Sequence, residues 1–136
     1  MEALAARGGV RIATGGRGRA YRGSPSRGLA PAIRVPDVRG QVSYFVALHE
    51  LGHLLSPGNR SLRQLEAEAD AWRWALAVAL VEPTAATARS MHRALSSYLE
   101  RTLAKRRYGY RTFAAIPPDE SFFWTVLAEL EARAGG

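Results

Sequence analysis

The chain has 136 residues, 47% of them apolar, which is enough to form one globular domain with its own core. It has no cysteine, which excludes a disulfide framework, a thiol nucleophile and a cysteine zinc site. No stretch approaches the roughly 20 apolar residues of a membrane span, and the charged N-terminus (Glu2, Arg7, Arg11) predicts no signal peptide.

The net charge of +7 is concentrated near the N-terminus. Eight arginines lie between Met1 and Gly40, against the two acidic residues Glu2 and Asp37. Such a basic arm could meet nucleic acid, an acidic partner or an acidic substrate. It is equally compatible with an ordinary arginine-rich surface, because net charge bears on association rather than on fold.

Residues 1–39 are rich in glycine and arginine and carry short segments with the alternation of β-strands. Those segments are Val10–Ala13, Arg19–Arg22 and Ala32–Pro36. The first two are separated by glycines and are expected to pair with each other. We therefore predict a small antiparallel sheet in this arm.

Residues 40–136 show helical periodicity instead. Ser61 and Gln64 have the spacing of a capping box, and prolines precede the last two periodic segments. The predicted helices are Gly40–Leu55, Ser61–Val81, Thr84–Arg107 and a final one that starts at Pro117–Glu120. The predicted class is α+β, a single domain in which a small N-terminal sheet precedes a mainly helical part.

The chemically distinctive motif is His49-Glu50-Leu51-Gly52-His53. Residues four apart lie one above the other on a helix, so His49 and His53 can present imidazole nitrogens to one metal ion. Glu50 can then reach a metal-bound water as general base. Zinc suits such a site because it accepts imidazole and carboxylate ligands and keeps one position open.

A third ligand is expected from the segment Glu66-Ala67-Glu68-Ala69-Asp70. Glu66 and Asp70 share a helix face, so we predict that Glu66 binds the metal and that Asp70 accepts the free N–H of a histidine ligand. Glu68 projects about 200° away from Glu66, so one helix cannot direct both glutamates to one ion. The pairing with Asp70 favours Glu66 over Glu68.

The two motifs together, His49–Leu55 and Glu66–Trp72, resemble the ImmA/IrrE family of zinc metallopeptidases, a minimal form of gluzincin. The resemblance implies a zincin-like domain, one Zn²⁺ held by His49, His53 and Glu66, and a cytoplasmic location. It also implies that the substrate is a protein, with helix-turn-helix repressors as candidates. The chain has no recognisable helix-turn-helix segment of its own.

A donor to the developing oxyanion completes the chemistry of such peptidases. His92, the one remaining histidine, is a candidate for this role. Tyr98, Tyr108 and Tyr110 are comparable candidates, and the sequence does not rank them.

The sequence thus predicts a zinc metallopeptidase that hydrolyses peptide bonds, with a transcriptional regulator as a candidate substrate. The alternative is a non-catalytic zincin-like protein that binds a repressor or nucleic acid through its basic N-terminal arm, including Arg17, Arg19 and Arg22. Zinc-dependent hydrolysis of a non-peptide amide is a third possibility without a feature of its own in the sequence.

Overall fold

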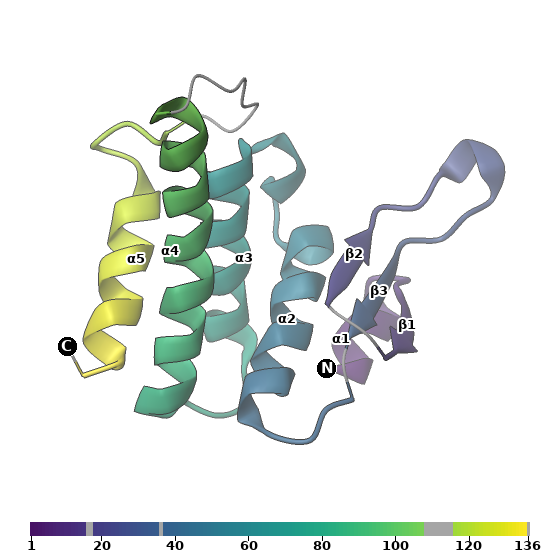
Figure 1. Cartoon of the computed structure of the whole chain (residues 1–136). Helices are drawn as coiled ribbons and strands as arrows, with labels where there is room; N and C mark the ends of the chain where they lie inside the picture. The colour runs from purple at the N-terminus through teal and green to yellow at the C-terminus, as the bar shows by residue number, and fades with distance from the viewer. Residues whose placement is uncertain (16–17, 36, 108–115, 136) are drawn as a thin grey trace.

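The computed structural model describes residues 1–15, 18–35, 37–107 and 116–135. The chain folds as a small sheet followed by a layer of helices, which confirms the predicted α+β class (Figure 1). The strands are β1 (Arg11–Thr14), β2 (Arg19–Tyr21) and β3 (Ala32–Val35). The α-helices are α1 (Glu2–Arg7), α2 (Gln41–Leu55), α3 (Gln64–Val78), α4 (Ala85–Arg107) and α5 (Phe122–Arg133).

The three strands lie where the alternation predicted them, but they pair differently. The order is β1-β3-β2, with β1 parallel and β2 antiparallel to β3, so the expected pairing of the first two segments is wrong. Ile33 and Val35 of β3 are fully buried. The most apolar strand therefore takes the central position, and β2 is left at the edge of the sheet.

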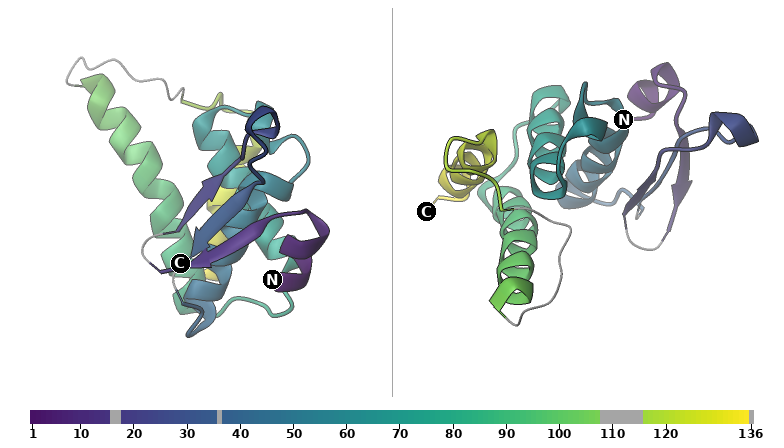
Figure 2. Two further views of the ribbon diagram at one scale, coloured as in Figure 1. Left: turned by 90° about the vertical axis from the view of Figure 1, so that its right-hand side faces the viewer. Right: turned by 90° about the horizontal axis from the view of Figure 1, so that it is seen from above.

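Helix α2 begins and ends almost where the sequence predicts. The backbone N–H of Gly40, the N-cap residue, donates to the Ser43 hydroxyl, and Leu55 is the last helical residue. Phe45, Leu48 and Leu51 are completely buried, and α2 lies between the sheet and α3 (Figure 2). Helix α2 therefore packs against the sheet on one side and against α3 on the other.

The contact between α2 and α3 is unusually close at Gly52. A Cβ atom at Gly52 would lie 2.9 Å from the carbonyl oxygen of Ala71 and 3.0 Å from its Cα, closer than a real side chain comes to backbone. The absence of a side chain at Gly52 thus sets the distance between the two helices.

Two helix starts differ from the predicted ones. Ser61 does not cap α3, because it ends a 3₁₀ turn (Asn59–Ser61) and Leu62 is extended; α3 begins at Gln64. Helix α5 begins at Phe122, and the hydroxyl of Ser121 accepts the N–H of Phe123. In both places a short turn takes up the residues that the sequence assigned to the helix.

Helix α1 was not predicted, because six residues are too few to show helical periodicity. It is fixed by Ala5, which is buried against the core. None of the helices in the described parts of the chain is both long enough and apolar enough to cross a bilayer.

Gly52→Ala is expected to destabilise the fold. Alanine normally stabilises a helix by about 1 kcal/mol relative to glycine, but here its methyl group would meet the backbone of α3. Overpacking of this kind costs about 1–3 kcal/mol, and we expect a net loss of that size in urea denaturation.

Gly40→Ala is the matched control, because a Cβ atom there meets nothing within 4 Å and the backbone is extended. It should cost less than about 1 kcal/mol, through the N-cap preference alone. Equal losses for the two variants would show that the helix contact at Gly52 is not the cause.

Candidate metal site and catalytic cleft

Helices α2 and α3 bring three metal-binding side chains together: His49, His53 and Glu68. The Nε2 atoms of the two histidines lie 3.2 Å apart. Carboxylate oxygens of Glu68 lie 2.8 Å from Nε2 of His49 and 3.3 Å from Nε2 of His53. Three donor atoms from two helices thus converge on one point, and the group could hold a metal ion.

The predicted histidine pair is therefore in place, but the expectation that Glu66 completes it is wrong. Glu66 accepts a hydrogen bond from the Ser121 hydroxyl at 2.7 Å, which places it toward the start of α5. Glu68 lies on the side of α3 that faces α2. The two glutamates do diverge as the sequence predicted; the error lies in which of them faces the histidines.

The face of α3 that contacts α2 carries a signal that the sequence analysis did not use. Ala67, Ala71 and Ala75 recur every four residues, and all three are buried. Small residues with this spacing allow another helix to approach, and Ala71 is the residue that meets Gly52. Glu68 comes one turn before Ala71 and so faces the turn of α2 that holds the histidines.

His53 is oriented by Asn59, which lies in the 3₁₀ turn between α2 and α3. The Asn59 amide donates to the backbone oxygen of Ala67 and to Asp70, both at 2.9 Å. Its carbonyl oxygen then faces Nδ1 of His53 at 3.3 Å. Nδ1 carries the hydrogen in this arrangement, so Nε2 keeps a free lone pair toward Glu68 and His49.

We expected Asp70 to accept the N–H of a histidine directly, and this prediction is wrong. Asn59 stands between them, and Asp70 also accepts hydrogen bonds from Ser56 at 2.7 Å and Arg73 at 2.8 Å. Although burial acts to raise the pKa of Asp70, these donors outweigh it and lower the pKa. Asp70 is thus an ionised anchor for the amide that positions His53.

The electrostatics of the cluster leave His49 and Glu68 with free donor atoms and favour a proton on His53. Burial lowers the pKa of His49, which keeps its imidazole neutral. Burial acts to raise the pKa of Glu68, but its contacts with His49 and His53 outweigh this and lower the pKa to about 2. Burial acts to lower the pKa of His53, but Glu68, Asn59 and Glu50 together raise it.

Glu50 lines the same cleft, on the side that faces the sheet. A Cβ atom at Gly18, just before β2, would come within 3.2 Å of its carboxylate, so the backbone at Gly18 passes close to Glu50. Burial raises the pKa of Glu50 to about 7. The carboxyl group faces a cavity of about 500 Å³ whose lining also includes His49, His53 and Glu68.

Tyr98 of α4 also lines this cavity, and His92 does not. His92 is six residues earlier on the same helix, about 9 Å along its axis and about 120° around it. Burial, with the negative charges of Glu68 and Glu50, raises the pKa of Tyr98, which keeps its hydroxyl protonated. The structure thus brings Tyr98 to the cleft in place of His92; Tyr108 and Tyr110 lie outside the described residues.

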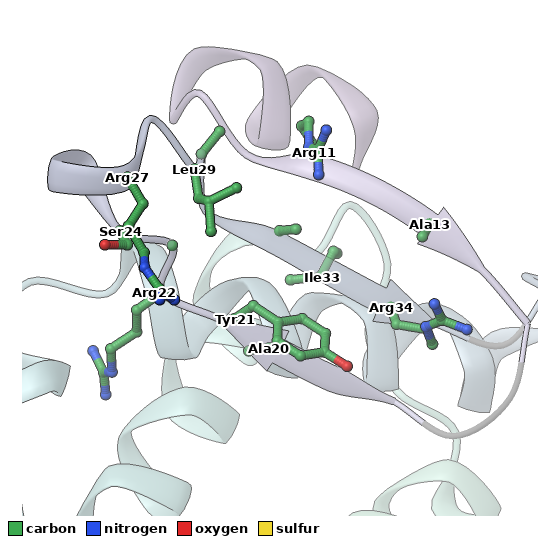
Figure 3. Close-up of a pocket in the computed structure, with 13 residues that line it drawn as sticks. Arg11, Ala13, Ala20, Tyr21, Arg22, Ser24, Arg27, Leu29, Ile33 and Arg34 are labelled. Atoms are coloured by element: carbon green, nitrogen blue, oxygen red, sulfur yellow. The ribbon is translucent and has the colours of Figure 1, made fainter.

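The predicted basic arm forms the outer face of the sheet. A cavity of about 640 Å³ lies there, and Arg11, Arg22, Arg27 and Arg34 line it (Figure 3). All four are exposed, and Arg34 alternates along β3 with buried residues. The arginines therefore point away from the core, and Arg22 also reaches the cleft that holds Glu50.

Comparisons of the chain with models of known protein families, with curated proteins and with solved structures gave no match.

Glu68→Gln is expected to abolish tight binding of a divalent metal ion, whereas Glu66→Gln should retain it. Only Glu68 has carboxylate oxygens within 3.3 Å of the histidine nitrogens. Both changes remove one negative charge from the same helix, so charge alone cannot separate them. Elemental analysis after reconstitution and desalting should give about one ion per chain for Glu66→Gln; loss of the ion from that variant instead would contradict the assignment.

Asn59→Ala should weaken metal binding about 10–100-fold, because His53 loses the partner that holds its ring and its tautomer. Ser56→Ala is the control, since it removes a hydrogen bond to Asp70 without touching His53. Competition against a chromophoric chelator measures both affinities. If the two variants bind equally well, Asn59 does not position the ligand.

Proposed function

We propose that this protein is a zinc-dependent peptidase whose metal ligands are His49, His53 and Glu68 and whose general base is Glu50. One observation carries the proposal. The Nε2 atoms of His49 and His53 lie 3.2 Å apart, and each lies within 3.3 Å of one of the two carboxylate oxygens of Glu68, on the wall of a cleft that also contains the partly buried carboxyl group of Glu50.

The spacing of the donor atoms fits a tetrahedral ion. Zinc bonds to imidazole nitrogen and carboxylate oxygen are 2.0–2.2 Å long, which puts neighbouring ligand atoms about 3.4 Å apart. Here the two imidazole nitrogens are 3.2 Å apart, Oε2 of Glu68 is 2.8 Å from His49 and Oε1 is 3.3 Å from His53, and one ligand atom from each residue lies within 4.8 Å of the others. Two histidines and one carboxylate also match the ligand set of catalytic zinc, which leaves a fourth position open.

The hydrogen bonding of the cluster fits a group of metal ligands. Oε2 of Glu68 is buried and has no hydrogen-bond partner among the described residues, although Nε2 of His49 is 2.8 Å away. Buried carboxylate oxygens are normally satisfied, and one that is not calls for an explanation such as an ion. If Oε2 of Glu68 and Nε2 of His49 both bind one ion, they can be 2.8 Å apart without a hydrogen bond between them.

The position of β2 supports a peptide as the substrate. This strand is at the edge of the sheet, and Gly18, Arg19 and Ala20 line the cleft beside Glu50. An extended chain can add to such an edge through backbone hydrogen bonds. A peptide bound there would run past the metal ligands, which gives peptide hydrolysis an advantage over the hydrolysis of a small amide.

The roles of the chain's own residues follow from their places in the cleft. His49, His53 and Glu68 would hold the ion, which would supply the Lewis acidity that activates water and polarises a carbonyl group. Glu50 accepts a proton from the attacking water and donates it to the leaving amine. The hydroxyl of Tyr98 donates a hydrogen bond to the developing negative charge on the substrate oxygen.

The resemblance to ImmA/IrrE metallopeptidases supports His49, His53 and Glu50 in these roles, although it implied Glu66 and not Glu68 as the third ligand, and it makes repressors candidate substrates. The rival function, docking through the basic arm without catalysis, draws support from the exposed arginines of the sheet. It predicts that a protein lacking Glu50 works normally, whereas one lacking Arg19 and Arg22 does not. Arg17, the third arginine of that hypothesis, lies outside the described residues.

Glu50→Gln should retain the metal ion and lose hydrolysis by at least about 100-fold, because the amide cannot accept the proton. The measurement is cleavage of a defined peptide library by zinc-loaded protein, followed by mass spectrometry. Glu66→Gln is the control, since that residue is paired with Ser121 away from the cleft. A Glu50→Gln protein that cleaves as fast as the wild type would overturn the mechanism.

A further inference from the structure

Arg22, directly after β2, occupies a junction between three cavities. It lines the catalytic cleft, the cavity on the outer face of the sheet and a third cavity of about 400 Å³. In Figure 3 its side chain extends away from the strands, whereas Arg34 stays over the sheet. One exposed cation is therefore shared by the cleft and the surfaces that lead into it.

The third cavity extends the cleft beyond His53. His53 lines both, and Arg60, from the turn between α2 and α3, lines the far cavity together with Arg22. Leu54 and Leu55 supply apolar lining. The cavity thus offers two guanidinium groups and an apolar wall next to one of the candidate metal ligands.

The lining of this cavity is positively charged. None of its lining residues is acidic, and neither Arg22 nor Arg60 forms an ion pair within the described parts of the chain. Glu50 and Glu68 line the cleft but not this cavity. A guanidinium group binds a carboxylate with well-directed paired hydrogen bonds, and two such groups at one cavity favour an acidic occupant.

We propose that Arg22 and Arg60 select peptides that carry an acidic side chain on the His53 side of the catalytic cleft. This inference rests on the proposed peptidase function and adds a substrate class to it. The carboxylate occupies the third cavity between the two arginines, and the neighbouring backbone passes His53 toward Glu50. Arg22 and Arg60 are then specificity residues, separate from the residues that carry out the reaction.

An acidic peptide fits this region better than a nucleic acid. The third cavity has no Phe, Tyr or Trp in its lining, whereas single strands are held by stacking on such rings. Its apolar residues suit the aliphatic stem of a glutamate. It also opens beside the metal ligands, where a bound peptide has a reaction to undergo.

The test measures binding separately from hydrolysis. The probes are a short fluorescein-labelled peptide with several glutamates and the same peptide with glutamines, each titrated against zinc-loaded Glu50→Gln protein by fluorescence anisotropy. We expect the glutamate peptide to bind about five- to tenfold more tightly at low salt, and high salt to reduce the difference. Adding Arg22→Gln and Arg60→Gln should abolish the preference.

Arg89→Gln with Arg93→Gln is the matched control. These arginines are exposed on α4 and line neither cavity, and their substitution removes the same charge from the protein. The preference should survive in this variant. Equal binding of the two peptides, or an equal loss in the control, overturns the proposal.

A labelled single-stranded oligonucleotide forms the last arm. If it binds more tightly than the glutamate peptide and depends on Arg22 and Arg60, the cavity is a nucleic-acid site and the proposal is wrong. Charge-selective binding without hydrolysis by the wild type would overturn the peptidase function and leave the recognition intact. Hydrolysis by the wild type without a charge preference would overturn the proposed recognition and support the peptidase function.

Discussion

The close contact between α2 and α3 is the constraint on which the candidate site depends. Gly52 meets the backbone of Ala71, and no larger residue fits at that distance. His49 and His53 flank this point on α2, and Glu68 precedes Ala71 by one turn on α3. Side chains of ordinary length can therefore bring the Glu68 carboxylate within 3.3 Å of both histidine nitrogens. A wider helix spacing would leave the carboxylate out of reach of the imidazoles.

The turn between the two helices connects this packing to the chemistry. It places Asn59 in the core, 1% exposed, where the amide is held by the backbone of α3 and by Asp70. The same amide sets the tautomer of His53. Asp70 in turn is held by Ser56 and Arg73, so the hydrogen bonds that stabilise the turn also orient the His53 imidazole. The polar groups of this turn serve both purposes because Ser56, Asn59 and Asp70 are hydrogen-bonded to one another.

The cleft lies between two parts of the chain with different electrostatic character. The helices contribute Glu50, Glu68 and the histidines, whereas the sheet and the turn contribute exposed arginines. The edge strand β2 belongs to both, since it borders Glu50 and is followed by Arg22. The proposed peptidase would thus bind the backbone of its substrate at the strand and read its charge at the arginines beyond His53.

The sequence by itself determined the features that depend on local periodicity. The limits of α2 and α4 and the placement of His49, Glu50 and His53 on one helix follow from residue spacing, because a helix fixes the direction of each side chain relative to its neighbours. Only the tertiary structure decided how separate elements meet. The place of β3 between β1 and β2, the choice of Glu68 over Glu66, the interposition of Asn59 before Asp70 and the arrival of Tyr98 instead of His92 all depend on which faces pack together. Packing is settled by the burial of Ile33, Val35 and Ala71 across elements distant in sequence, and no single segment carries that information.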